Sequence, residues 1–422
     1  MLEMCNRWLG YMLMIALGLA IGFTPGQVRA EPWDVSGNSL PTLPVPIGPY
    51  QHDGSGFYTG IEFLMMHETR AIGRQVIASR GYVPSFDFPN PGGSPSPGFV
   101  GGVPRGSGAT ALASDQLGNT SWAPGWRITA GYRMEDGTSF SVSWAHLQDV
   151  KYSGGAGSQG PNFAQVDGGD NTFLFAPVFN FSPLFSGAPN RVIATVPGVG
   201  TAPVSGLLNG IWNGASDMSM LFSQRFDNWD IAGRFPVFQS ENARSYAIAG
   251  ARFAWIWERF QWVTTDLNYT GDDTTGFTAS YDGQYAARYD NTLSQRMYGP
   301  MIGAGHEVYL GSGFGLGCET SFAPLLDIAK ERVKYIRVDE TTQAKRGWID
   351  NTITLNLNFA INLTWQPFEG MTLRAGWNAY NFFNTYYMER PVGFNMGALD
   401  PTYGTQIYRL MHGLNVGLAY TW

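Results

Sequence analysis

Cysteine and charge are both scarce in this chain of 422 residues. Its only cysteines are Cys5 and Cys318. If Cys5 is removed with a signal peptide, Cys318 can form no intramolecular disulfide, and no cysteine cluster remains to bind a metal. Charged residues make up 14% of the chain, whereas soluble domains carry about 25%. A surface that faces lipid needs few charges, so this deficit indicates a membrane protein.

The chain also lacks an excess of basic residues. It has 26 lysines and arginines against 33 aspartates and glutamates, and a formal net charge of −7. Proteins that bind nucleic acid need a basic surface to contact phosphate groups. The charge balance therefore argues against a nucleic-acid partner.

Long apolar runs are absent apart from one at the N-terminus. The run Trp8–Ile21 is too short for a transmembrane helix, which needs about 20 apolar residues. Small residues at Val28-Arg29-Ala30 then give a cleavage site for a secretory signal peptide, with Glu31 as the first mature residue. We predict a signal peptide at 1–30, a proline-rich periplasmic lead-in at 31–55, and one membrane domain at 56–422.

Two segments alternate between apolar and polar residues along their whole length. In Thr352–Trp365 the odd positions are apolar and nearly all even positions are polar, and Gly413–Trp422 repeats the pattern with apolar even positions. Side chains on a strand point to opposite faces with a period of two. A strand needs about 9 to 11 residues to cross a bilayer when tilted. The alternation, its length and the terminal Trp422 predict an all-β, antiparallel transmembrane barrel.

The connections between strands alternate between short and long, as in an outer-membrane barrel whose termini are both periplasmic. Long connections are predicted at 80–123, 151–216, 266–292, 330–349 and 384–404, on the extracellular side. Short periplasmic turns are predicted at 135–137, 239–243, 311–312 and 367–370. About ten strands result, with twelve as the alternative: 57–67, 125–135, 138–150, 217–237, 244–265, 293–310, 312–328, 350–366, 370–383 and 405–422. In the fifth strand the alternation is lost after Trp257, which predicts a β-bulge there, with an amphipathic helix as the alternative.

If the apolar faces point to lipid, several charged residues point into the lumen. These predicted lumen residues are Glu62, Arg127, Arg133, Arg252, Glu258, Glu307, Glu319 and Arg374. Poorly hydrated charges persist when they are paired, and arginine suits bidentate pairing with carboxylates. Ten strands are close to the eight that side chains fill completely, while open aqueous channels need 16 or more. The set therefore fits either a salt-bridge network that fills the lumen or the lining of a narrow, charge-selective pore.

No group of residues predicts catalysis. His67 and Glu68 are adjacent, so they point to opposite faces of a strand, and His146 lies on an apolar face. A general base needs an orienting partner and a nucleophile within hydrogen-bond reach. We therefore expect no enzyme, with a hydrolase at the outer rim as the alternative. No cofactor or metal site is expected, because Gly271-Asp272-Asp273, which could bind calcium in a surface loop, is better explained as an exposed acidic turn.

Three segments resemble one known family. They are Pro124–Arg133, Gly250–Phe253 followed by Glu258, and Tyr298–Ala304. Together they resemble the outer-membrane beta-barrel porins of planctomycete-type bacteria, the seventh family of that name, over nearly all of the mature chain. The resemblance implies an outer-membrane barrel of undefined transport role and transfers no catalytic residues.

We therefore expect a narrow porin in an outer membrane that passes small solutes or ions, with a structural or adhesive surface protein of closed lumen as the alternative. The expected partners are outer-membrane lipid and the outer-membrane assembly machinery. The transported solute and the formation of a homo-oligomer are left open by the sequence.

Overall fold

The structure is a computed structural model of the chain. It describes residues 56–80, 108–157, 174–178, 195–196, 200–201, 212–215, 217–240, 242–265, 268–272, 276–280, 286–337, 343–368 and 370–422. The chain divides into two units, Met1–Val45 and Pro46–Trp422, and all described residues belong to the second. The predicted signal peptide (1–30) and lead-in (31–55) lie outside the described residues. Among the residues described, no helix has both the length and the apolar character needed to cross a bilayer.

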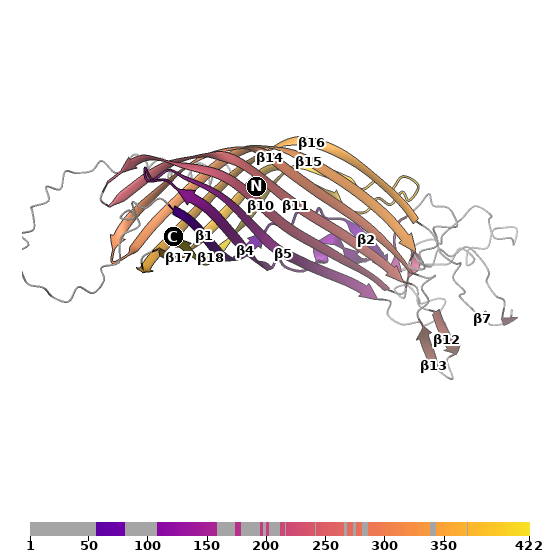
Figure 1. Cartoon of the computed structure of the whole chain (residues 1–422). Coiled ribbons are helices and arrows are strands. Elements are labelled where there is room, and N and C mark those ends of the chain that lie inside the picture. Colours follow the sequence, from indigo (N-terminus) through magenta and orange to yellow (C-terminus); the bar gives the residue numbers. More distant parts are fainter. Residues whose placement is uncertain are drawn as a thin grey trace, which may run out of the picture. The chain divides into compact units, whose positions relative to one another are not determined.

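Ten long strands form a closed antiparallel barrel (Figure 1). Around the wall their order is β1-β18-β17-β16-β15-β14-β11-β10-β5-β4, and β4 pairs with β1 to close it. Their bounds are β1 Gly56–Glu68, β4 Trp122–Arg133, β5 Ser139–Gly157, β10 Asp217–Gln239, β11 Ala243–Thr265, β14 Ala286–Gly311, β15 Phe314–Arg337, β16 Gln343–Phe368, β17 Met371–Arg390 and β18 Thr402–Thr421. The barrel, the antiparallel pairing and ten rather than twelve wall strands confirm the predicted fold.

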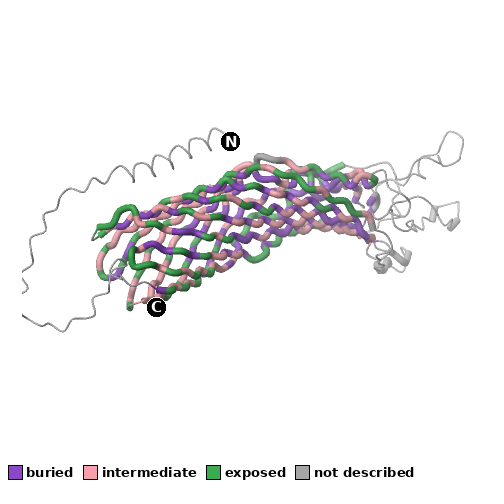
Figure 2. Tube along the Cα trace, turned by 45° about the horizontal axis from the view of Figure 1, so that its top comes forward, coloured by how far each residue is buried: buried purple, intermediate pink, exposed green. Residues whose placement is uncertain are grey.

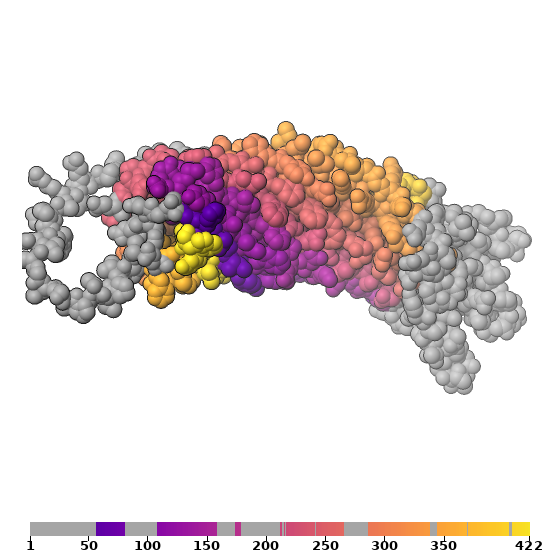
Figure 3. Space-filling view, viewed as in Figure 1, coloured from indigo at the N-terminus to yellow at the C-terminus, as the bar shows by residue number. Residues whose placement is uncertain are grey.

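The barrel has a short-turn end and a long-loop end. At the short-turn end, tight connections join β4 to β5, β10 to β11, β14 to β15 and β16 to β17. Strands extend further toward the long-loop end than predicted, because residues there keep pairing beyond the apolar band. The predicted long connection at 330–349 is wrong: β15 runs to Arg337 and β16 begins at Gln343. In the space-filling view, side chains of neighbouring strands cover the wall between these ends (Figure 3).

The outer face of the barrel is apolar over a broad band. Buried and exposed residues alternate along the wall strands, as a period of two requires (Figure 2). The exposed side includes Ile61, Ile128, Ile302, Ile353 and Val416. Large exposed apolar residues that cover a whole belt are typical of contact with hydrocarbon. The alternation that predicted the strands therefore marks the lipid-facing surface.

Nearer the long-loop end, apolar residues occupy the inward-facing positions of the strands and not only the outward-facing ones. On β11, Phe253, Trp255 and Trp257 point outward, whereas Phe260 and Trp262 are fully buried on the inner side. The pairing of β11 with β10 and β14 continues through this region without a register shift. The predicted bulge after Trp257 is therefore wrong. The apolar residues change face because this part of the lumen is filled by an apolar core.

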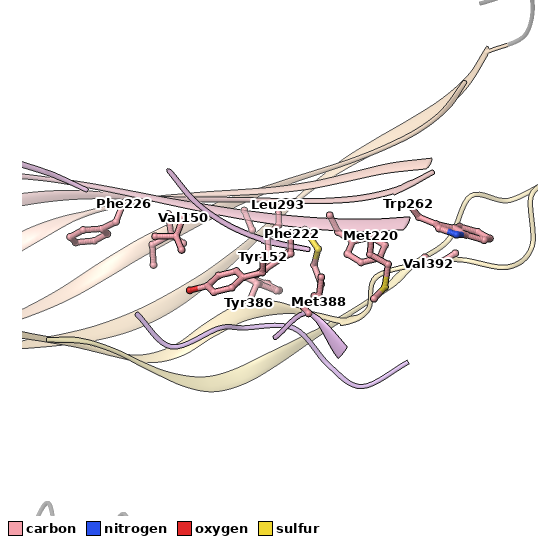
Figure 4. Packing of buried hydrophobic residues seen from close by; sticks show 14 of the residues in the cluster. Val150, Tyr152, Met220, Phe222, Phe226, Trp262, Leu293, Tyr386, Met388 and Val392 are labelled. Atoms are coloured by element: carbon pink, nitrogen blue, oxygen red, sulfur yellow. The ribbon is translucent and has the colours of Figure 1, made fainter. Parts of the chain in front are cut away.

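That core surrounds a small sheet. Strands β2 (Val76–Arg80), β3 (Thr110–Ala113), β6 (Leu174–Phe175) and β9 (Asn213–Ala215) pair in the order β3-β2-β6-β9, and the 3-10 helix η2 (Ser114–Gln116) follows β3. Ile77, Leu112 and Trp212 are fully buried in one cluster with inward-facing wall residues. Figure 4 shows part of that cluster, including Phe222 and Trp262. We call the small sheet with its flanking residues Gln75 and Trp212, η2 and the segment 391–401 the plug.

Two hairpins complete the described residues: β7 (Thr195–Val196) with β8 (Gly200–Thr201), and β12 (Asn268–Asp272) with β13 (Gly276–Ser280). Gly271 and Asp272, which belong to the acidic turn considered for calcium, lie in β12, and Asp273 lies outside the described residues. Within the described part of the chain no group of three or more histidine, cysteine or acidic side chains could hold a metal ion.

The wall changes at β17. Its pairing with β16 ends at Phe383, which lies opposite Leu355. After Phe383 the remaining part of β17 turns toward the lumen. There the side chain of Gln295, on β14, donates to the backbone oxygen of Tyr386 (3.1 Å) and accepts from its backbone nitrogen (2.8 Å). Gln295 thus satisfies the backbone groups that a neighbouring strand would otherwise bind. This turn places the connection from β17 to β18, the segment 391–401 of the plug, inside the lumen against β14.

Candidate functional site

The lumen contains two levels with different chemistry. Toward the short-turn end lies a polar cavity of about 270 Å³, which we call the chamber. Its charged lining is Glu62, Arg127, Arg133, Asp230, Arg234, Arg244, Arg252, Glu307, Glu319 and Arg374. Seven of the eight predicted lumen residues are in this set, and Glu258 is the exception. Beyond the chamber, toward the long-loop end, lies the apolar core around the plug.

Glu62 is the acceptor for two arginines. Arg127 Nη1 lies 2.9 Å from Glu62 Oε2, and Arg374 Nη1 lies 3.2 Å from Glu62 Oε1. Asn415 Nδ2 donates to the same carboxylate at 3.2 Å. Arg127 also donates to the Tyr380 hydroxyl at 2.6 Å. The predicted pairing of Glu62 with lumen arginines is therefore present, and it links β1 to β4 and β17.

Arg252 is paired with an acid that the sequence reasoning did not select. Its Nε and Nη2 lie 2.7 and 2.9 Å from the two oxygens of Asp230, a bidentate geometry. Its Nη1 donates to Asn356 Oδ1 on β16, three positions further around the wall. Arg252 therefore forms its salt bridge with none of the four predicted glutamates, because Asp230 is its direct cross-strand neighbour.

Glu319 likewise binds an arginine that was not predicted. Arg234 Nη2 lies 3.3 Å from Glu319 Oε2, and the Tyr246 hydroxyl donates to the same oxygen at 3.1 Å. Arg234 stands on β10 and Glu319 on β15, three positions apart around the wall. The pair therefore spans part of the chamber instead of joining neighbours.

Arg133 and Arg244 form no salt bridge with any of the described residues. Arg133 lies over the Tyr58 ring (6.0 Å to the centroid) and Arg244 over the Tyr246 ring (5.6 Å). Glu307 accepts from the Tyr246 hydroxyl at 3.4 Å and forms no salt bridge within the described chain. The four predicted arginines therefore do not pair one-to-one with the four predicted glutamates. Six arginines face four acids in the chamber, so its lining is net cationic.

Glu258 lies deeper, inside the apolar core. Its carboxylate binds Arg409, with Nη1–Oε1 at 2.5 Å and Nη2–Oε2 at 2.9 Å, and both side chains are almost completely buried. Gln224 Nε2 adds a third hydrogen bond at 2.9 Å. Glu258 therefore belongs to the closed part of the lumen and not to the chamber.

Arg409, Asp230 and Arg234 were all accessible to sequence reasoning. Extending the alternation of the last strand back from Asn415 turns Arg409 inward, since odd positions face the lumen there. The outward residues Trp229 and Ile231 likewise turn Asp230 inward. The residues that face the lumen had been predicted neither for β10 nor for the first half of β18.

The histidines lie mostly on the outer face of the wall. His67 Nε2 is 2.7 Å from the Thr120 hydroxyl and its ring is 5.5 Å from that of His412. Glu68 is buried on the opposite face, as predicted. His146 Nδ1 is 2.7 Å from Asp227 Oδ1, which also accepts from the Trp144 ring nitrogen at 3.1 Å. The His146–Asp227 pair was not predicted, because the two residues are cross-strand neighbours on separate strands.

No protein-family model matches the chain, and no curated protein matches it in sequence. Solved structures with some likeness are outer-membrane barrels. The outer membrane protease OmpT from Escherichia coli is 10% identical over 87% of this chain and 97% of its own, with a TM-score of 0.37. A Pseudomonas aeruginosa FadL homologue (10% identity, 88% and 90% coverage, TM-score 0.21) and a mutant of the TodX monoaromatic hydrocarbon channel (9%, 87% and 90%, 0.20) are also similar.

The comparison with OmpT corrects one prediction. The sequence was taken to exclude an enzyme, yet a protease is among the similar barrels. At this identity and structural agreement the likeness transfers no activity, and the channels among the matches transfer no solute. The catalytic status of the chain is therefore open.

Proposed function

We propose that the chain is an outer-membrane barrel with a closed lumen, which anchors its long connections at the cell surface. The observation that carries this proposal is the plug. Trp212 is fully buried with its ring 4.6 Å from Trp262 and 5.5 Å from Tyr335 of the wall. Polar contacts also hold the plug to the wall strand β14: Asn291 Nδ2 donates to the Pro391 backbone oxygen at 2.8 Å, and the Tyr289 hydroxyl accepts from the Gly393 backbone nitrogen at 3.0 Å.

The energetics favour the closed state. Burial of one large apolar side chain stabilises by about 1.5 to 3 kcal/mol. The plug buries Ile77, Leu112, Leu174 and Trp212 together, so its displacement would cost several times that amount. The predicted lumen network then acts as part of the filling: Glu258 with Arg409 fixes the core, and Glu62 with its arginines fixes the wall of the chamber.

A narrow porin is the second candidate, and the chamber is the observation that favours it. Its net cationic lining, with Arg133 and Arg244 forming no salt bridge in the described chain, suits small anions. Under this candidate the plug has to move for conduction. The resemblance to the planctomycete-type porin family agrees with either candidate, since it implies a barrel of undefined role.

Conductance in planar bilayers separates the two candidates. The wild-type protein should give no stable channels, because the plug fills the lumen. A variant with Ile77→Asp and Trp212→Ala should weaken the plug and conduct anions better than cations. The matched control is Trp229→Ala, which removes a tryptophan from the lipid-facing side and should stay closed. Steady conductance by the wild type would reject the closed lumen in favour of the porin.

Accessibility in cells tests the membrane location and its orientation. Single cysteines are placed in a Cys318→Ser background at Glu389, exposed at the long-loop end, or at Asp136, in a short turn. A maleimide that cannot cross membranes should label the first in intact cells and the second only after the outer membrane is ruptured. The reverse pattern would invert the proposed orientation, and no labelling of either in intact cells would reject a surface location.

A further inference from the structure

A group of basic residues lies on the outer face of the wall, beyond the apolar band. Four adjacent strands, β11, β14, β15 and β16, form a shallow groove there of about 440 Å³. Its outward-pointing cations are Arg259, Arg288, Arg332, Lys334 and Lys345. We call this surface the basic groove. It is separate from the chamber, because its residues occupy the opposite face of the same strands.

The strand register places these cations close together. Thr292 stands opposite Arg259 on one side and Arg332 on the other, and Arg332 in turn faces Gly347. Gly347 has no side chain, so nothing from β16 fills the groove beside Arg332. In the next row Lys334 directly faces Lys345. Like charges directly opposite each other on a sheet are destabilising unless another group neutralises them.

Neutralisation within the described chain is incomplete. Asp290 is the acid in the lining, and it lies 2.9 Å from Arg259 and 3.2 Å from Arg288. Arg332, Lys334 and Lys345 form no salt bridge with any described residue. Three positive charges therefore remain grouped on this face. A group of three cations favours the binding of an anion that carries more than one negative charge.

The level of the groove on the wall indicates the source of that anion. On β15 the outward residue before Arg332 is Lys330, and the ones before that are apolar: Ile328 and Leu326, of which Leu326 is 50% exposed. On β16, Ile349 is 62% exposed, two residues from Gly347. On β11, the outward Trp257 precedes Arg259, and tryptophan favours the membrane interface. Apolar and basic residues therefore mix on the wall just before the groove, as is typical of the height of lipid headgroups.

We propose that the basic groove binds the phosphate groups of an anionic lipid of the outer leaflet. Arginine and lysine at the groove supply charge and hydrogen-bond donors to phosphate oxygens. The apolar band below lets the acyl chains of the same molecule lie along Leu326 and Ile349. A soluble anion would use the charges without the apolar surface. This inference rests on the membrane location of the proposed function but not on its closed lumen.

Binding of lipid A by the purified, detergent-solubilised protein tests the proposal, with native mass spectrometry as the readout. Diphosphorylated lipid A should bind more tightly than its fully dephosphorylated form. The variant Arg332→Gln, Lys334→Gln, Lys345→Gln should lose about a hundredfold in affinity at low salt, from about 1 kcal/mol per basic residue near an anionic surface. The loss should shrink as salt is added.

The matched control removes three exposed cations elsewhere: Arg74→Gln, Lys151→Gln and Arg390→Gln. It should retain nearly the wild-type affinity, which separates the groove from overall charge. Equal affinity of the groove variant and the wild type would overturn the proposal. Competition by inorganic pyrophosphate at the concentration at which lipid A binds would overturn the lipid source and leave a site for soluble anions. These outcomes do not depend on channel activity, so they are distinguishable from failure of the closed-lumen proposal.

Discussion

Arg409 and Glu258 form a bidentate ion pair across the lumen, from strands on opposite sides of the barrel. Five steps around the ten-stranded wall separate β18 from β11. Arg409 Nε also donates to the Thr385 hydroxyl at 3.0 Å, so the inward part of β17 is tied to the same pair. Because both charged groups are removed from water, the pair holds opposite walls together only while both partners are present.

Removal of one partner should therefore be costly. Arg409→Met leaves the Glu258 carboxylate buried without its cation, and loss of one member of a buried pair costs about 3 to 5 kcal/mol. Replacing both, with Arg409→Met and Glu258→Gln, should be less destabilising than Arg409→Met alone. Denaturant titration of the protein refolded into vesicles measures the free energy of unfolding.

The control for this prediction is Arg74→Gln. Arg74 lies 3.0 Å from Asp115, and its side chain is 76% exposed. An exposed pair contributes about 0 to 1 kcal/mol. If Arg74→Gln and Arg409→Met change the free energy of unfolding by similar amounts, the burial assigned to the Arg409–Glu258 pair is wrong.

A second prediction concerns the two faces of β16. Leu357 lies on the lipid-facing side, near the middle of the apolar series from Ile353 to Trp365. Leu357→Arg should cost about 2 to 4 kcal/mol, as for a charge near the bilayer midplane. Ala360→Arg should cost much less, because Ala360 lines the chamber and stands opposite Glu319. Equal losses in the same refolding assay would mean that the assignment of inner and outer faces is wrong.

Much of the wall was predictable because apolar and polar residues alternate along its strands with a period of two. All ten wall strands were located, and seven of the eight predicted lumen residues line the chamber. The partners were harder to predict, since strand tilt and register decide which side chains meet. Arg234 and Glu319 illustrate this: their strands, β10 and β15, are separated by β11 and β14, and no local pattern links the two residues. Glu319 was predicted to face the lumen, and Arg234 would also have been a candidate if the residues of β10 that face the lumen had been identified.

The plug was missed for a different physical reason. Its strands come from connections far apart in sequence, and β6 and β9 have two and three residues. Segments this short are too short to show an alternation of apolar and polar residues. The loss of alternation after Trp257 was a usable signal: Phe260 and Trp262 are apolar at positions that should face the lumen. It was interpreted as a bulge because a polar lumen had been assumed along the whole barrel.

The last prediction concerns Asn384, where β17 turns away from β16. Its φ of 63° lies in the left-handed region, which asparagine and glycine adopt more readily than other residues. Its side chain donates to the Ile353 backbone oxygen at 2.9 Å and to the Thr352 hydroxyl at 3.2 Å. These bonds satisfy groups on β16 at the point where the ladder between the two strands ends.

Asn384→Val should destabilise the protein by about 1 to 3 kcal/mol, because a β-branched residue is strained at positive φ. Asn384→Gly keeps the backbone conformation and loses only the side-chain hydrogen bonds, so it should fall between the valine variant and the wild type. Thermal unfolding of the three proteins in one detergent measures the order. If valine is tolerated as well as glycine, β17 does not need the left-handed residue to turn inward, and the turn must be held by the contacts of Tyr386 and Thr385 in the lumen.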